Sequence, residues 1–197
     1  MHGRWIIHLI VLSTTYAAPQ GQPEPYSIKL DKLGENLSQW LANNPDFDHC
    51  DNNTVDNRPG SAIDTDVVYC FPRIHDDKRL TYGSAPLLTE TVWFYKRSLY
   101  KLEMTLRSRF GLADAMPALE AKFGEPSGRE VTWLQNGFGA KFERSRWTWT
   151  NKLSTVELVY SDAPDDYPTI TVTLDAANKE VSDRIKRAEQ TRARSDM

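Results

Sequence analysis

The stretch ETVWFYKRSLYKLEMTLRS, residues 90–108, decides the fold class of this chain. In its second half, apolar residues alternate with polar or charged ones, and the apolar positions are Tyr100, Leu102, Met104 and Leu106. Successive side chains of a β-strand point to opposite faces, so this alternation predicts a strand with one buried and one wet face. The first half is a second apolar strand, and KRS at residues 96–98 joins the two as a hairpin.

Strand-like segments of the same kind lie on both sides of this hairpin. They are residues 64–74 before it and residues 130–135, 139–151, 154–161 and 169–175 after it. Two other segments have apolar residues at helical spacing: DKLGENLSQWLAN at residues 31–43 and GLADAMPALEAKFGEP at residues 111–126. Each of these helices precedes a run of strands, so the chain order is a helix and then strands, twice.

This order predicts an α+β fold of two tandem lobes, each a helix packed on an antiparallel sheet. The first lobe covers residues 28–107 and the second covers residues 108–175. An edge-to-edge junction of the two sheets would hide one edge of each. Residues 176–197 are strongly charged and have a few apolar residues at helical spacing, which predicts a short C-terminal helix or tail.

The N-terminal segment has the order of a secretory signal. Residues 1–17 begin with a basic start, continue with the apolar run WIIHLIVL and end in small residues, which predicts a signal peptide. Residues 18–27 are rich in Pro and Gln and predict a flexible leader. The sequence has no second apolar run of membrane length and no Cys at the cleavage point to carry a lipid. We therefore expect an exported protein, periplasmic or secreted, without a membrane anchor.

The segment PDFDHCDNNTVDNRPG, residues 45–60, combines four aspartates with His49 and Cys50. Its spacing fails for a calcium loop, which needs Gly at the sixth position and Glu at the twelfth. Zinc needs three or four Cys or His ligands at short spacing, and this segment offers too few. Cys50 and Cys70 are the only two cysteines, and in an exported chain two cysteines predict a disulfide. We expect neither a metal nor a cofactor.

Catalysis is the alternative interpretation of the same segment. A small hydrolase or metal-dependent enzyme would use His49, His75 and the neighbouring aspartates. The sequence contains neither a G-x-S-x-G nor an H-E-x-x-H motif. We therefore predict no catalytic residues and interpret the chain as a non-catalytic binding or accessory domain.

Three tryptophans of the predicted second sheet are the candidates for a binding face: Trp133, Trp147 and Trp149. Exposed Trp side chains anchor protein interfaces, so an exposed set indicates a docking surface. Burial of the same side chains under the helix of residues 111–126 would instead make them part of the core.

The charge of the chain restricts the class of partner. The net charge is -3 at pH 7, whereas nucleic-acid binding needs a basic face, so we expect no nucleic-acid partner. The remaining expectation is a protein partner.

Several motifs of the chain occur together in an order that resembles a known group of proteins. They are the leader, the Leu-rich helix, the Cys pair, LTYG at residues 80–83, LYKLEMTL at 99–106, LEAKFGEP at 119–126 and TVELVY at 155–160. This order resembles a group of uncharacterised exported bacterial proteins. Its layout is similar to the tandem helix-plus-sheet lobes of the β-lactamase inhibitor protein and to the small lipoprotein of the outer-membrane β-barrel assembly machine. The resemblance implies a non-enzymatic exported domain, and no inhibitory or assembly residue carries over by position.

Overall fold

The computed structural model describes residues 24–29, 31–54, 63–72, 81–108, 111–164 and 166–195. The predicted signal peptide, residues 1–17, and residues 18–23 of the predicted leader lie outside the described residues.

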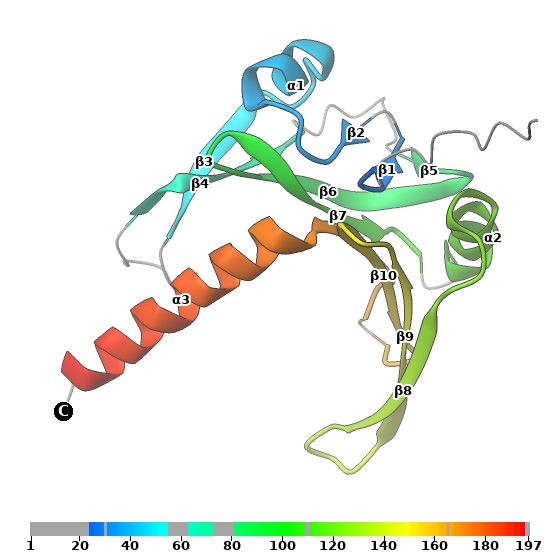
Figure 1. Ribbon diagram of the computed structural model, residues 1–197. Helices are drawn as coiled ribbons and strands as arrows, with labels where there is room; N and C mark the ends of the chain where they lie inside the picture. Colours follow the sequence, from blue (N-terminus) through cyan, green and yellow to red (C-terminus); the bar gives the residue numbers. More distant parts are fainter. Residues whose placement is uncertain are drawn as a thin grey trace, which may run out of the picture.

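One large antiparallel sheet organises these residues (Figure 1). Its strands are β3 (His49–Thr54), β4 (Ile63–Phe71), β5 (Thr81–Tyr82), β6 (Ala85–Tyr95), β7 (Ser98–Leu106), β8 (Gly128–Gln135), β9 (Lys141–Thr150), β10 (Ser154–Ser161) and β11 (Thr169–Leu174). The order across the described sheet is β3-β4-β6-β7-β11-β10-β9-β8, with β5 paired to β6 outside this path. The hairpin predicted from residues 90–108 forms β6 and β7 at the centre of the sheet.

The prediction of two tandem lobes, each with its own helix-covered sheet, is wrong. Strands β7 and β11 pair from Thr169 opposite Thr105 to Thr173 opposite Lys101, so the strands before and after residue 108 belong to one continuous nine-stranded sheet. A strand edge presents unpaired backbone N–H and C=O groups, and joining two such edges satisfies both. Apolar alternation predicts the buried face of each strand but contains no information about which edges meet.

Two helices and a small strand pair cover one face of the sheet. They are α1 (Leu37–Asn43), α2 (Gly111–Phe123) and the pair β1 (Ser27–Ile28) and β2 (Asp31–Lys32); in Figure 1, α1 and the strand pair lie above the sheet and α2 lies to its right. Their apolar side chains meet those of the sheet in a single core that includes Trp40, Phe94, Leu119 and Trp149. Because this core is shared by residues on both sides of the β7–β11 junction, the sheet and its covering helices form one packing unit.

Helix α1 is shorter than the predicted helix of residues 31–43. Gly34 has a φ of 93°, a left-handed conformation that Gly adopts without steric cost and that interrupts a helix. The helix begins after Asn36, whose side chain accepts a hydrogen bond from the Ser38 amide at 2.9 Å, as an N-cap does. Asp31, the first residue of the predicted helix, lies in β2 and accepts a hydrogen bond from Trp40 Nε1 at 2.6 Å.

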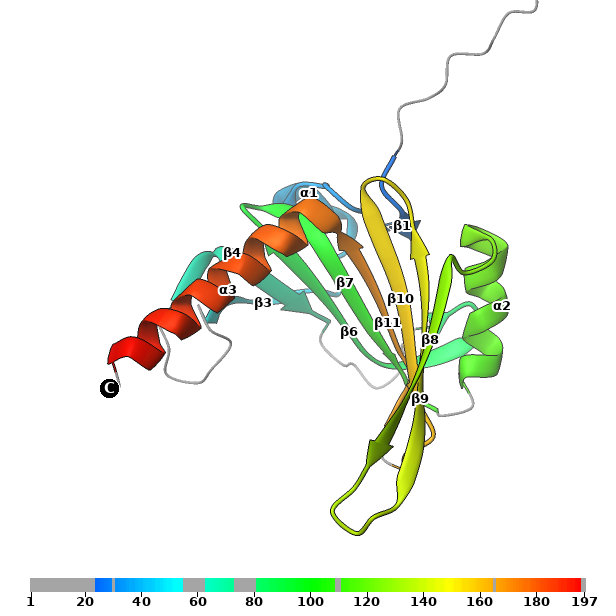
Figure 2. The same cartoon turned by 60° about the horizontal axis from the view of Figure 1, so that its bottom comes forward.

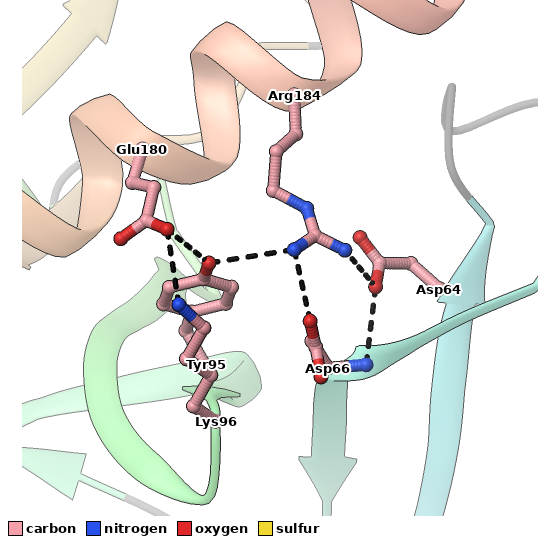
Figure 3. Close-up of polar contacts among 6 residues, drawn as sticks. All are labelled: Asp64, Asp66, Tyr95, Lys96, Glu180 and Arg184. Carbon is pink, nitrogen blue, oxygen red and sulfur yellow. Dashed lines mark hydrogen bonds and ion pairs between the residues drawn. The ribbon is translucent and has the colours of Figure 1, made fainter.

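The third helix, α3 (Asp175–Ser195), lies on the opposite face of the sheet (Figures 1 and 2). Val181 is buried there against side chains of β4, β6 and β7. A polar cluster accompanies this small apolar contact (Figure 3). Arg184 of α3 contacts Asp64 Oδ1 at 2.7 Å and Asp66 Oδ2 at 2.9 Å, and the Tyr95 hydroxyl donates to Glu180. The rest of this face, over β11, β10 and β9, is polar and half-exposed.

Candidate binding surface

The β8–β9 hairpin forms one end of the sheet and extends away from the covering helices (Figure 2). β8 and β9 pair from Gly128 opposite Thr148 to Gln135 opposite Lys141, without a shift in register. β8 is an edge strand, and each of its eight residues is exposed. The hairpin therefore presents a regular strand whose outer edge and both faces are open among the described residues.

Large apolar side chains gather on this hairpin. Their exposed fractions are 44% for Val131, 66% for Trp133, 38% for Leu134 and 98% for Phe138. Elsewhere in the described part of the chain, only Leu88 and Tyr167 are large hydrophobic residues with comparable exposure. Val131 and Trp133 share one face of β8, Leu134 projects on the other face, and Phe138 lies in the turn. Single exposed apolar residues are ordinary, but several of them on one hairpin indicate an interaction site.

The three predicted tryptophans lie on one face of the sheet, and their burial differs. Trp149 is fully buried in the core, and its Nε1 donates to the carbonyl of Gly124 at 2.8 Å, at the end of α2. Trp147 is half-buried, with the Arg129 guanidinium over its ring at 5.2 Å. Trp133 extends past the helix-covered region and is exposed. Of the three, only Trp133 has the exposure of an interface anchor.

The tip of the hairpin is held by Asn136. Its side-chain Oδ1 accepts hydrogen bonds from the amides of Phe138 at 3.0 Å and Ala140 at 2.9 Å. Gly139 has a φ of 85°, which suits Gly at a tight turn. This turn fixes the backbone around Phe138 and leaves the Phe138 ring in solvent.

The hairpin is basic although the whole chain is acidic. Residues 127–150 contain four basic residues, Arg129, Lys141, Arg144 and Arg146, and two acidic residues, Glu130 and Glu143, which gives +2 for the segment against -3 for the chain. Ion pairs on the hairpin are long: Arg129 to Glu143 is 3.9 Å and Arg146 to Glu130 is 3.7 Å. Within the described residues, Lys141 and Arg144 form no ion pair.

A pocket of about 180 Å³ opens on the face of the hairpin opposite the tryptophans, lined by Glu130, Thr132, Arg144 and Arg146. Arg146 Nε has no hydrogen-bond acceptor among the described residues, but Arg146 forms long ion pairs with Glu130 at 3.7 Å and with Glu157 at 3.8 Å. Arg144 forms no ion pair there, and a guanidinium binds carboxylate oxygens by charge-assisted hydrogen bonds, so this pocket favours a group that brings acceptor oxygens.

The two edges of the sheet differ in their protection. At the β3 edge the register with β4 shifts between Asn52 and Asn53, and the strand is polar. Bulges and charged residues are the usual protection of an edge against adding another strand. β8 has no register shift and no Pro, and its two charged residues, Arg129 and Glu130, lie at its start, so Val131 to Gln135 carry no charge. Among the described residues, the less protected edge for strand pairing is therefore at β8.

The predicted disulfide is confirmed. Cys50 of β3 and Cys70 of β4 lie directly opposite each other and are bonded. The acidic segment of residues 45–60 is thus partly a strand. A disulfide is compatible with an exported protein, because disulfides persist in oxidising compartments.

The residues of the enzymatic alternative are only partly described. The His49 side chain is half-exposed and lies 3.6 Å from Asp51 Oδ2, while His75 lies outside the described residues. No group of three or more His, Cys, Asp or Glu within the described ranges has the geometry to hold a metal ion.

A second polar site lies under α1. Lys29 Nζ contacts Glu90 Oε2 at 2.6 Å, and the buried Asp31 accepts from Trp40, beside a pocket of about 230 Å³ that also involves residues 43–47. Burial raises the pKa of the Asp31 carboxyl to about 6, although the Trp40 hydrogen bond opposes this rise. Each carboxylate of this site is engaged by a partner from another segment, so the arrangement anchors β1, β2 and α1 to the sheet.

Comparison of the chain with protein-family models, with curated proteins and with solved structures finds no match. The resemblance to exported bacterial proteins therefore stays a prediction. No helix among the described residues is long and apolar enough to span a membrane.

Sequence reasoning identified Trp133 but missed the other members of the surface. Val131, Leu134 and Phe138 belong to segments whose composition matches a half-buried strand and a turn. The available signal was Phe138 between two glycines, because a large ring in a tight turn has no strand neighbour to pack against.

Proposed function

We propose that this chain is an exported, non-catalytic binding domain, periplasmic or secreted, that docks a protein partner on the β8–β9 hairpin. The observation that supports this proposal is the set of exposed apolar side chains on an open edge strand and its turn: Val131, Trp133, Leu134 and Phe138. Aromatic side chains surrounded by polar residues and Arg are the usual composition of interface centres. The disulfide supports export, because it stabilises the polar β3 edge in an oxidising compartment.

Site-specific cross-linking in cells that export the chain tests this proposal. A photoreactive amino acid replaces Phe138 in one variant and Leu88, an exposed apolar residue of β6, in the control variant. We expect a discrete covalent adduct with a protein from the Phe138 position and none from the Leu88 position. Adducts from Leu88 alone, or equal adducts from both positions, would contradict docking on the hairpin.

The variant Trp133→Ala tests the anchor itself. Truncation of a central Trp at an interface costs about 2 kcal/mol or more, so we expect the adduct at position 138 to fall by about tenfold or more. Because Trp133 is exposed, its removal leaves the core intact, and an unchanged melting temperature serves as the folding control. An undiminished adduct would show that Trp133 is no anchor.

A further inference from the structure

The backbone of β8 offers hydrogen bonds to a further strand. In an antiparallel pair, opposite residues alternate between hydrogen-bonded and non-hydrogen-bonded pairs. Trp133 lies opposite Glu143, and the Glu143 carbonyl accepts from the amide of Asp162 on the β10 side at 3.1 Å. The Trp133 amide and carbonyl therefore point away from β9, toward the open edge.

The same alternation directs the backbone amides and carbonyls of all odd-numbered β8 residues toward the open edge. At the hairpin tip the Asn136 amide donates to the Ala140 carbonyl at 3.0 Å, so the even-numbered residues of β8 face β9. The residues with outward-facing backbone groups are Arg129, Val131, Trp133 and Gln135. Unsatisfied N–H and C=O groups in a regular row are a template for strand addition.

The two faces of the hairpin at this edge have different chemistry. Val131 and Trp133 project on the face that also carries Trp149, whereas Thr132 projects on the face that carries Arg144 and the pocket. Alternate residues of an added strand would lie beside these two surfaces in turn. One set would lie beside Val131 and Trp133. The other would lie beside Glu130 and Thr132 of β8, with Arg144 one strand further on β9, opposite Thr132.

We infer that the occupant of this edge is an extended segment of a partner protein in which apolar and acidic residues alternate, added to the sheet beside β8. This inference rests on the proposed binding function and specifies its mode and its partner. The apolar residues pack on Val131 and Trp133, and a carboxylate reaches past Thr132 to Arg144, which forms no ion pair among the described residues. Charge complementarity selects this occupant over a second copy of the chain, because two hairpins of net charge +2 would repel each other at a shared edge.

A synthetic peptide with alternating Val and Glu, of the same length as β8, tests the inference. We expect it to quench or shift Trp133 fluorescence and to protect the amides of Val131 and Trp133 from hydrogen exchange. Three control peptides share its length: one carries Lys in place of Glu, one has the Val and Glu residues in separate blocks, and one is N-methylated at alternate residues. We expect each control to bind at least about tenfold more weakly.

Two charge-reversal variants of the protein test whether the charge of Arg144, rather than the net charge of the chain, determines peptide binding. Arg144→Glu is expected to weaken binding of the Val/Glu peptide by about tenfold or more and to improve binding of the Val/Lys peptide. Arg187→Glu, an exposed position of α3 far from β8, is the control for net charge and is expected to leave the affinity unchanged. Binding to the Val/Glu peptide should weaken as salt is added, since the contact is exposed.

The outcomes distinguish this inference from the proposed function. Equal affinity for the Lys peptide overturns the acidic character of the partner, and binding without protection of the Val131 and Trp133 amides overturns strand addition; either result overturns the inference. Protection of these amides in the protein alone, together with a dimer in sedimentation, assigns the edge to a second copy and also overturns the inference. If adducts still form at position 138 in either case, docking on the hairpin stands; if no adducts form there, the proposed function fails as well.

Discussion

At the residue scale, the burial of Asp31 is the least expected feature. The sequence places Asp31 at the start of a predicted helix, where an N-cap carboxylate is solvated. In the structure it is buried in β2, accepts from Trp40 Nε1 and lies near Glu90, whose own partner is Lys29. Whether a carboxylate caps a helix or is buried depends on neighbours from distant segments. The position of Asp31 in the sequence therefore did not indicate its burial.

The raised pKa of Asp31 predicts a pH dependence of stability. The folded-state pKa is about 6 and the ordinary value is 3.8, so the folded state binds the proton first as the pH falls. Asp31 therefore lowers the free energy of unfolding above pH 6, and this loss is recovered as the pH falls from about 6 to about 4. The size of the effect is on the order of 2 to 3 kcal/mol.

The variant Asp31→Asn keeps an acceptor for Trp40 and removes the charge. We expect it to be more stable than the natural chain at pH 8, with a difference that shrinks toward zero near pH 4, measured by urea denaturation across this range. Glu120→Gln, on the exposed side of α2, is the control and should show no such trend. A constant difference at all pH values would mean that the pKa of the Asp31 carboxyl is the same in the folded and unfolded states.

At the element scale, α3 shows how a charged helix is held on a sheet. Its apolar contacts are few, since Val181 is its buried side chain among the described residues and Ile185 is partly buried. The Arg184 guanidinium adds two ion pairs, one to Asp64 and one to Asp66 (Figure 3). The sequence indicated a helix here but not its attachment, because the carboxylates that receive Arg184 are more than a hundred residues earlier in the chain.

Removal of the Arg184 contact should weaken the attachment of α3. In Arg184→Gln the buried Asp64 keeps its charge without a cationic partner, which we expect to lower the free energy of unfolding by roughly 2 kcal/mol. Hydrogen exchange of the α3 amides should increase more than that of the central strands. Lys179→Gln removes an exposed ion pair with Asp183 on the same helix and should leave both measurements unchanged. Equal effects of the two variants would mean that Arg184 contributes no more than a surface charge.

At the scale of the whole molecule, the continuous sheet predicts a single cooperative unfolding transition. Leu158 is fully buried in β10, within the core shared by both sides of the β7–β11 junction. Leu158→Ala should therefore cost about 3 kcal/mol and lower the denaturation midpoint equally for reporters placed near Trp40 and near Trp149. Leu88→Ala, at an exposed site, is the control. A midpoint shift confined to the Trp149 reporter would indicate two independently folding units.

The sequence by itself determined the buried faces of the strands from their alternation, the presence of helices at the segments that became α1, α2 and α3, and the disulfide from its two cysteines. These properties depend on residue type and on spacing within one segment. Only the tertiary structure decided four other features: the junction of β7 with β11, the formation of strand β3 within the acidic segment, the burial of Asp31 and the exposure of β8. Each of these features depends on contacts between segments that are distant in the sequence, because one segment covers an edge or a face of another. The residue pattern within a single segment does not indicate which segments will contact it.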